Sequence, residues 1–125
     1  MGAEPPGRLG LPRARRIKHS RDFARAKREG RRVTIGCLVA NWLALPAGSS
    51  SRLGVITSRK LGGAVARARA RRLLREAFRL HQNELAQPLD LVLVARSSIV
   101  GKAFAAVERD LLAALRQGKL LREAA

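Results

Sequence analysis

One stretch, residues 64–83, most constrains the fold, because its apolar and basic residues separate onto two faces of a helix. At 100° per residue, the arc that contains Leu74 and Phe78 is apolar, and the opposite arc consists almost entirely of arginines. Neighbouring like charges four residues apart repel by roughly a few tenths of a kcal/mol, and only Glu76 interrupts that arc. The arginines at this spacing are Arg67, Arg71, Arg75 and Arg79, which we call the arginine row.

A bound polyanion explains this row better than self-stabilisation does, since phosphates would turn the repulsion into charge-assisted hydrogen bonds. The alternative interpretation is a helix face that is merely solvated. The composition favours the polyanion, because the 125 residues include 26 Lys and Arg against 9 Asp and Glu, a net charge of +17. The length predicts one domain with its own core.

A membrane surface is the weaker alternative as a partner for this charge. No apolar run approaches the roughly 20 residues of a spanning helix. The basic helix also carries Ala where an interfacial helix would carry Trp and Phe. We therefore expect no membrane partner.

The titratable residues that usually carry catalysis are scarce. Cys37 is alone, which excludes a disulfide framework and favours a reducing cytoplasm. His19 and His81 are far apart, and no carboxylates cluster as in a two-metal site, so the sequence predicts neither a catalytic residue nor a metal held by the protein alone. Residues 1–12 contain Pro and Gly without the apolar core of a signal peptide, and we expect a flexible tail there.

The remaining periodicities predict an α+β sandwich with helices packed against one sheet. Its domain covers residues 13–117, and residues 118–125 are expected to fray. The elements alternate as helix, two or three antiparallel strands, helix, strand, helix. Helices are expected at Ser20–Glu29, Ala64–Asn83 and Lys102–Arg116, and strands within Arg32–Leu45, at Arg52–Thr57 and at Leu89–Ala95.

Two local details follow from turn and cap chemistry. Ser20 is expected to be the N-cap of the first helix and Gly30 its stop. The turn Pro46–Ser51 is expected to join the preceding strand to Arg52–Thr57 as an antiparallel hairpin.

The stretch around the long helix resembles a signature of the protein subunit of bacterial ribonuclease P. That signature reads Ser-Lys-Lys-hydrophobic-Gly-Asn-Ala-Val, then Arg-Asn-Arg, then a basic pair followed by Leu-Leu-Arg-Glu-Ala-Phe-Arg. The chain carries matching residues at Ser58–Val65, Arg67–Arg69 and Arg71–Arg79. The resemblance covers the chain from about Leu11 to Leu115.

The chain departs from the family pattern at four positions. The usual Asn is replaced by Gly63 before the helix and by Ala68 between two arginines, so two side-chain amides are missing. Lys27 and Asn41 stand where the family commonly has aromatic residues. Stacking on a nucleic-acid strand is therefore expected to be poorer than is usual in the family, with charge in its place.

The resemblance implies an α-β-β-β-α-β-α order and a four-stranded mixed sheet, with the long helix in a left-handed crossover between parallel strands. It implies that the protein joins a catalytic RNA that removes the 5′ leader from precursor tRNA, using Mg2+ held by RNA and substrate. The partners are then the catalytic RNA and precursor tRNA, without DNA or membrane, in the cytoplasm.

The resemblance also implies two RNA-binding surfaces. The first faces the catalytic RNA and consists of Lys60, Arg67, Arg69, Arg71, Arg72, Arg75 and Arg79. The second, on the sheet and the first helix, receives the leader and consists of Arg16, Lys18, Phe23, Arg25, Lys27, Ser58, Arg59 and Arg96.

Alternatives remain for single residues and for the whole chain. Each arginine could be a solvated charge, and Phe23 could anchor its helix in the core instead of stacking on the leader. A small ribosomal RNA-binding protein would share the charge and the arginine-rich helix. A helix-turn-helix DNA reader is a third option, but no Asn or Gln within Arg67–Arg79 could read adenine.

Overall fold

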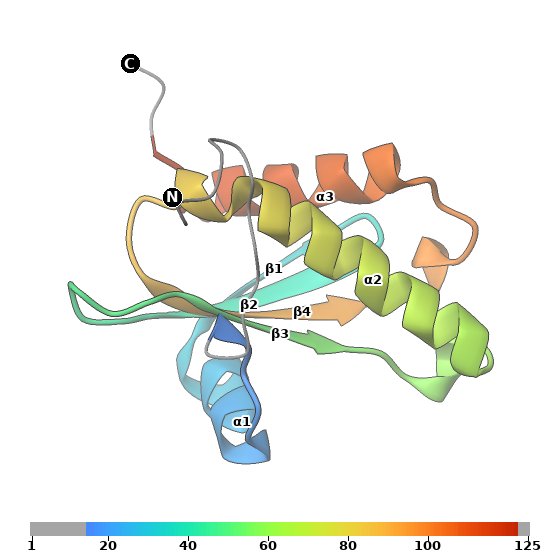
Figure 1. The fold of residues 1–125 in the computed structure, drawn as a ribbon, viewed down its shortest axis with the longest axis horizontal. Coiled ribbons are helices and arrows are strands. Elements are labelled where there is room, and N and C mark those ends of the chain that lie inside the picture. Colours follow the sequence, from blue (N-terminus) through green and yellow to red (C-terminus); the bar gives the residue numbers. More distant parts are fainter. Residues whose placement is uncertain (1–14, 123–125) are drawn as a thin grey trace, which may run out of the picture.

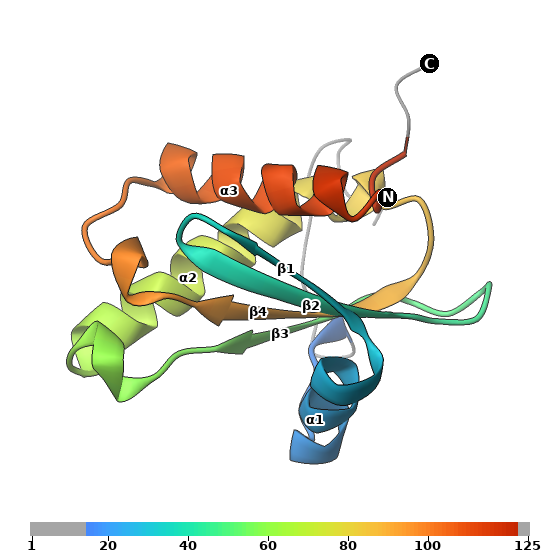
Figure 2. The same cartoon turned by 180° about the vertical axis from the view of Figure 1, so that it is seen from behind.

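The computed structural model describes residues 15–122 and confirms the predicted element order. Figures 1 and 2 show a sheet with α2 and α3 across one face and α1 against the other. Short 3-10 turns η2, η3 and η4 lie at Arg59–Leu61, Gln82–Glu84 and Ser97–Ile99. The helices and strands are α1 (Ser20–Glu29), β1 (Arg31–Ile35), β2 (Leu38–Ala44), β3 (Arg52–Ile56), α2 (Ala64–His81), β4 (Leu89–Ala95) and α3 (Phe104–Gln117).

The sheet has the order β1-β2-β4-β3. β1 and β2 form an antiparallel hairpin, β2 and β4 are also antiparallel, and β3 runs parallel to β4, with Leu53 opposite Leu91. The predicted hairpin between the second and third strands is therefore wrong, because β4 lies between them. The parallel pair connected through α2 agrees with the family resemblance, and the left-handed course of that connection stays a prediction.

The apolar sequence of β4 explains its central place. Leu91 and Leu93 face α2 and α3, while Val92 faces α1, and all three are fully buried. A strand buried on both faces needs a neighbour along each edge and a layer on each side. The helices therefore pack against this one sheet from both sides, with α1 covering part of the face opposite α2 and α3.

The main core lies between the sheet and the two long helices. The predicted apolar arc of α2 is confirmed, since Ala70, Leu74, Ala77 and Phe78 are buried there. The arginine arc is left on the outside of this packing, so the core fixes which way the basic residues of α2 face.

The first helix begins one residue earlier in its cap than predicted and ends as predicted. His19 occupies the N-cap position and makes no side-chain cap, while Ser20 is already helical. Gly30 is the C-cap, and its N–H donates to the Ala26 carbonyl at 3.0 Å. A Cβ at Gly30 would lie 2.1 Å from the Trp42 carbonyl oxygen, so close backbone approach requires glycine here.

Residues 118–122 are packed rather than frayed. Leu120 is buried, Leu121 pairs with Leu85 in an antiparallel bridge, and the Arg122 N–H donates to the Glu84 carbonyl at 2.8 Å. Burial of Leu120 explains why the chain turns back onto the domain after α3. The predicted tail at residues 1–12 and the last three residues lie outside the described residues.

Candidate nucleic-acid interface

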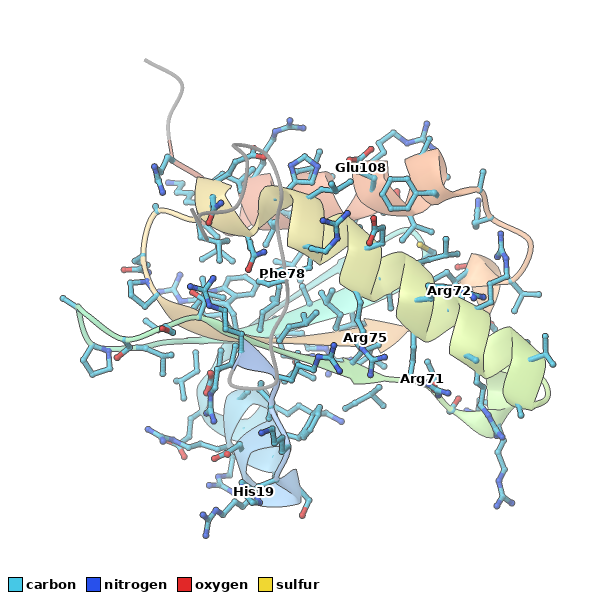
Figure 3. The ribbon with its side chains drawn as sticks, in the orientation of Figure 1. His19, Arg71, Arg72, Arg75, Phe78 and Glu108 are labelled. Carbon is cyan, nitrogen blue, oxygen red and sulfur yellow. The ribbon has the colours of Figure 1, made fainter. Side chains whose placement is uncertain are left out.

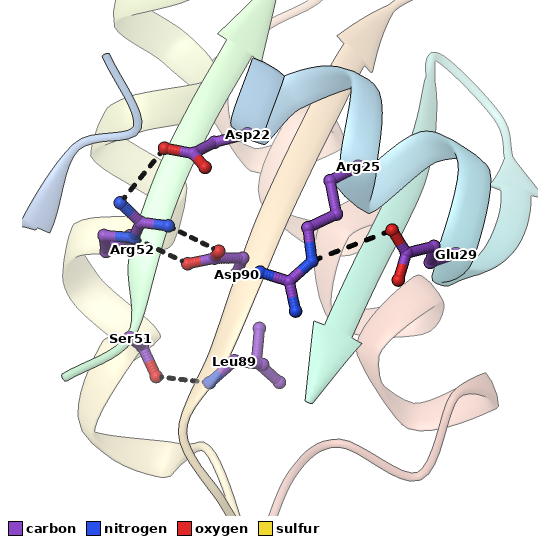
Figure 4. Close-up of polar contacts among 7 residues, drawn as sticks. All are labelled: Asp22, Arg25, Glu29, Ser51, Arg52, Leu89 and Asp90. Atoms are coloured by element: carbon purple, nitrogen blue, oxygen red, sulfur yellow. Dashed lines mark hydrogen bonds and ion pairs between the residues drawn. The ribbon is translucent and has the colours of Figure 1, made fainter. Parts of the chain in front are cut away.

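A partly buried charge network attaches α1 to the sheet (Figure 4). Arg52 of β3 donates to both carboxylate oxygens of Asp90 in β4, at 2.8 and 2.7 Å, and lies 3.5 Å from the Asp22 carboxylate of α1. The hydrogen bond to Asp90 raises the pKa of Arg52 above its ordinary value. This network sets where the first turn of α1 lies. Sequence reasoning missed it, although one acid inside the apolar run of β4 was an available signal.

Phe23 lies directly over β3. The position that a Cβ of Gly54 would take is 2.4 Å from the Phe23 Cε1, so the ring occupies the space left by the missing side chain. Phe23 is half-buried and packs on a small cluster formed by Ile17, Ala26 and Val92. The ring is therefore partly an anchor, and its remaining surface is open to a ligand.

A groove of about 330 Å³ opens beside this ring, and we call it the Phe23 groove. Three residues of the predicted leader set, Arg16, Lys18 and Phe23, meet there. Arg75, which was assigned to the other surface, also reaches it. The full lining is Arg16, Ile17, Lys18, Phe23, Leu53, Gly54, Val55 and Arg75.

A second cavity of about 360 Å³ lies against α2, and we call it the arginine pocket. It is lined by Arg16, Arg72, Arg75, Glu76 and Arg79. Arg16 and Arg75 thus line both cavities. The two surfaces that the sequence analysis kept apart are adjacent, and Arg16 and Arg75 form their junction.

The backbone explains how Arg16 reaches α2. Residues before α1 run beside β3, where Arg16 pairs with Leu53 in a parallel bridge and the Ile17 N–H donates to the Leu53 carbonyl at 2.8 Å. Arg15 donates to the Gln82 side chain at 3.2 Å, which holds this segment near the end of α2. Sequence reasoning found Arg16 but could not place it against Arg75.

The members of the arginine row have different surroundings. Arg71 donates to Thr57 Oγ1 at 2.9 Å, and Arg79 donates to both Glu76 carboxylate oxygens at 2.9 and 2.5 Å. Glu76, the one acid that interrupts the arginine arc, thus offsets the repulsion at Arg79, and its hydrogen bond raises the pKa of Arg79.

Arg75 is an exposed side chain that lies near other cations. Burial lowers its pKa, and the charges of Arg16 and Arg71 lower it further. Figure 3 shows Arg71 and Arg75 on the side of α2 toward α1. Among the described residues, no carboxylate forms an ion pair with Arg75. An anion at the junction would relieve this repulsion.

A third group gathers where α2 begins, and we call it the crossover end. Because β3 and β4 are parallel, both end at the same edge of the sheet, next to η2 and η4. The crossover end contains Ser58, Arg59, Lys60, Arg67, Arg69 and Arg96. Three of these were predicted for the leader and three for the catalytic RNA, so the fold does not group them as the sequence analysis did.

Hydrogen bonds within the crossover end and to neighbouring segments order its side chains. Arg96 donates to the Gly36 carbonyl at 2.9 Å, and Arg69 donates to the Lys102 carbonyl at 2.8 Å. Ser58 Oγ accepts from the Lys60 N–H at 3.3 Å and caps η2.

The last two predicted leader residues belong to α1. Arg25 and Lys27 are exposed and line neither the Phe23 groove nor the arginine pocket. Arg25 lies 3.8 Å from the Glu29 carboxylate. Neither side chain therefore joins Arg16, Lys18 and Phe23 in the groove lining, although Lys27 lies one helical turn beyond Phe23 on the same side of α1.

A histidine joins the two long helices behind the interface. His81 Nδ1 lies 2.5 Å from Glu84 and Nε2 lies 2.7 Å from Glu108 of α3. Burial opposes the charged imidazole, but its hydrogen bonds to Glu108 and Glu84 outweigh burial and raise the pKa of His81. Figure 3 shows Glu108 on α3, at the side of α2 away from α1.

Two other kinds of site are missing from the described part of the chain. Across residues 15–122, no helix combines the length and apolar character that crossing a membrane requires. Within the same residues, no three or more His, Cys, Asp or Glu side chains group so as to hold a metal ion.

The domain is strongly basic, and its arginine-lined cavities lie beside an aromatic ring that is only half-buried. These features define the class of small RNA-binding proteins. Comparison with known proteins narrows this class. The chain belongs to the ribonuclease P protein family, since the family described as Ribonuclease P matches residues 11–119. The resemblance seen in the signature is thereby confirmed.

Named relatives agree with this assignment. The chain is 39% identical to the ribonuclease P protein component of Gluconacetobacter diazotrophicus, over 84% of this chain and 91% of that protein. It is 37% identical to that of Chloroflexus aurantiacus, over 89% and 82%. The Staphylococcus aureus RNase P protein structure aligns with a TM-score of 0.79 at 28% identity, covering 88% and 100% of the chains. The Thermotoga maritima RNase P protein aligns with a TM-score of 0.72 at 28% identity, covering 82% and 96%.

Proposed function

We propose that this chain is the protein component of a ribonuclease P holoenzyme in the cytoplasm, which removes the 5′ leader from precursor tRNA. Membership of the ribonuclease P family supports this proposal and disfavours the ribosomal alternative. By the family resemblance, catalysis belongs to the RNA subunit, and the Mg2+ ions are held by that RNA and the substrate. The protein then contributes binding and positioning.

The Phe23 groove is the proposed site of the leader. A single strand can lay one base or ribose on the open surface of Phe23 while Arg16 and Lys18 meet its phosphates. The leader exists in the precursor and not in mature tRNA, so a site for it lets the holoenzyme retain substrate and release product.

The catalytic RNA is proposed to bind the arginine pocket and the crossover end. Both carry arginines that the packing of α2 directs outward, and folded RNA offers phosphates at matching density. We include Arg67, Arg69, Arg71, Arg72 and Arg79 here, together with Lys60. Arg25 and Lys27 are then outer charges that attract RNA at longer range.

The main observation behind this proposal is that Arg16 and Arg75 line both cavities. Phosphates of the leader and of the catalytic RNA would approach each other at this junction, and they would repel unless cations lay between them. Two arginines held close together, with the pKa of Arg75 already lowered, supply that charge. The junction would therefore position the leader against the catalytic RNA.

The test is reconstitution of the full chain with its catalytic RNA at low magnesium, measuring cleavage and the affinities for precursor and mature tRNA. Arg75→Gln should weaken both RNA binding and the preference for precursor, and should lower the salt slope of log K by about 0.7–0.9 for each phosphate that the variant no longer binds. Arg28→Gln is the matched control, because Arg28 is exposed on α1 and lines neither cavity. Equal behaviour of the two variants would refute a role for the junction, and absence of reconstituted activity would refute the proposed function.

A further inference from the structure

The crossover end exposes apolar side chains that the core does not use. Val65 is 85% exposed at the start of α2, and Val100 is 54% exposed in the turn after η4. Leu80, at 36%, is the other large apolar residue that is exposed within residues 15–122, and it lies at the opposite end of α2. Two exposed valines at one end of a small domain form a patch that needs an explanation.

A small cavity adjoins these valines. It has a volume of about 70 Å³, and its lining is almost wholly apolar. Val65 precedes Arg69 by four residues and therefore lies one turn before it on the same side of the helix, beside this cavity. The lining residues are Ala66, Arg69, Ala70, Ile99, Val100 and Gly101.

A hydrogen bond between distant segments lies beside the cavity. Arg69 donates to the Lys102 carbonyl at 2.8 Å, which fastens the turn after η4 to the first turns of α2. Ile99 is buried beneath and fixes η4 to the core. The patch is thus a formed surface on two anchored elements.

The charge around the patch indicates what covers it. Arg69 of α2 lines the cavity, and Lys102, whose carbonyl accepts from Arg69, lies in the turn beside it; we call these two residues the basic rim. No carboxylate lines the cavity. An apolar cavity beside the basic rim matches a nucleobase, whose ring faces are apolar while its own backbone carries phosphates.

On this basis we propose that Val65 and Val100 form a binding site for one unstacked base of the catalytic RNA, with the base edge in the cavity of about 70 Å³ and the flanking phosphates on the basic rim. The cavity is far smaller than a ligand pocket of roughly 300 Å³ or more, so it takes the edge of one ring and not a whole nucleotide. This inference rests on the proposed function, because it names a specific contact within the RNA-binding surface.

The test exploits the difference between apolar and ionic contacts. Removing a phosphate contact changes the salt slope of binding, whereas removing an apolar contact lowers affinity by the same factor at every salt concentration. Affinity of the full chain for the catalytic RNA is measured across a salt series for wild type and for Val65→Ser combined with Val100→Ser. We expect an affinity loss of about tenfold with an unchanged slope.

Two variants control for folding and for general loss of apolar surface. Leu80→Ser removes an exposed apolar side chain from the far end of the same helix and should leave RNA affinity unchanged. Val65→Ile keeps the apolar contact and should bind like wild type. Because both valines are exposed, melting temperatures should stay within a few degrees of wild type.

A positional experiment gives an independent readout. The single native cysteine, Cys37, is buried, so Val65→Cys can be labelled selectively with a photo-crosslinker. The label should crosslink to one short, unpaired segment of the catalytic RNA, whereas the same label at Leu80→Cys should not.

Three results would overturn the proposal. One is unchanged affinity of the double valine variant in a preparation whose wild type binds RNA and supports cleavage, which would leave the proposed function standing. Another is an affinity loss with an altered salt slope, which would assign the effect to displaced cations. The third is loss of self-association without loss of RNA binding, which would assign the patch to a second copy of the chain. A wild type that binds no catalytic RNA would overturn the proposed function as well.

Discussion

Arg52→Gln is expected to be among the most destabilising polar substitutions in this chain. The side chain of Asp90 is 6% exposed and that of Arg52 is 31% exposed, and two hydrogen bonds of 2.8 and 2.7 Å join them. Removing one partner of a buried pair costs roughly 3–5 kcal/mol, because the other charge is left without compensation. Water reaches Arg52, so we lower the expected loss in the free energy of unfolding to about 2–3 kcal/mol.

Urea unfolding, followed by the fluorescence of the single Trp42, measures this loss. Trp42 is buried against Gly118, so its emission should report the opening of the core. With a slope of about 1–3 kcal/mol per molar urea, the midpoint should fall by roughly 0.7–3 M. Adding Asp90→Asn should restore part of the loss, because the uncompensated charge is then absent.

Arg28→Gln is the control for this experiment, because it makes the same chemical change in a surface pair. Arg28 and Glu29 lie 3.1 Å apart with side chains 71% and 48% exposed, and such a pair contributes roughly 0–1 kcal/mol. If Arg52→Gln and Arg28→Gln shifted the urea midpoint equally, the network between α1 and the sheet would contribute no more to stability than a surface ion pair. The same result would remove the argument that this network positions Phe23.

Three further predictions concern other parts of the molecule. The pKa of His81 is raised in the folded protein above its ordinary value of 6.5, so the stability gained from protonated His81 should be complete below pH 6.5. This stability should be lost as the pH rises through the pKa of the folded state. His81→Gln should therefore abolish this pH dependence of the melting temperature. Gly63→Asn should raise the free energy of unfolding, measured in urea, by about 0.4–1 kcal/mol. The φ of −77° at Gly63 suits any residue, nothing crowds an added side chain, and α2 has no side-chain N-cap. Gly54→Ala should push the Phe23 ring out of its place and reduce the preference for precursor over mature tRNA, with catalytic-RNA affinity unchanged as the control.

The elements were predictable because their signals are local. The 3.6-residue period of α2 and the apolar run of β4 each determine one element from a short window, and both lie where the sequence placed them. Ser20 was misplaced by one position because cap assignment depends on the entry angle of the chain, which is not a local property.

Strand pairing was not predictable from the turn alone. The segment Pro46–Ser51 can close a hairpin or carry the chain across to another position in the sheet. The deciding property is the continuous burial of β4, which requires it to lie between β2 and β3. The choice between these two pairings can be made only when all strands are considered together. An argument from one turn and its two flanking strands therefore predicted the wrong partner for β3.

The sequence predicted which residues belong to the candidate site, but it did not predict which of them lie together. Arginines on one side of α2 follow directly from the helical period, and Phe23 stands out as an aromatic residue in a basic helix. The Phe23 groove, however, depends on α1 crossing the opposite face of the sheet, which is fixed by Arg52, Asp90 and Asp22. These three residues lie far apart in the sequence and no local pattern connects them, so the groove could not be predicted from the sequence.

The members of the arginine row differ in how far the fold already satisfies them. Glu76 engages Arg79 and Thr57 engages Arg71, so these two side chains have partners within the fold. Arg75 instead faces Arg16, and burial together with the neighbouring charges lowers its pKa. A phosphate gains most where the free protein holds cations in mutual repulsion, because binding then relieves that repulsion and adds new hydrogen bonds. The expected centre of RNA affinity is therefore the junction of Arg16 and Arg75, rather than the row as a whole.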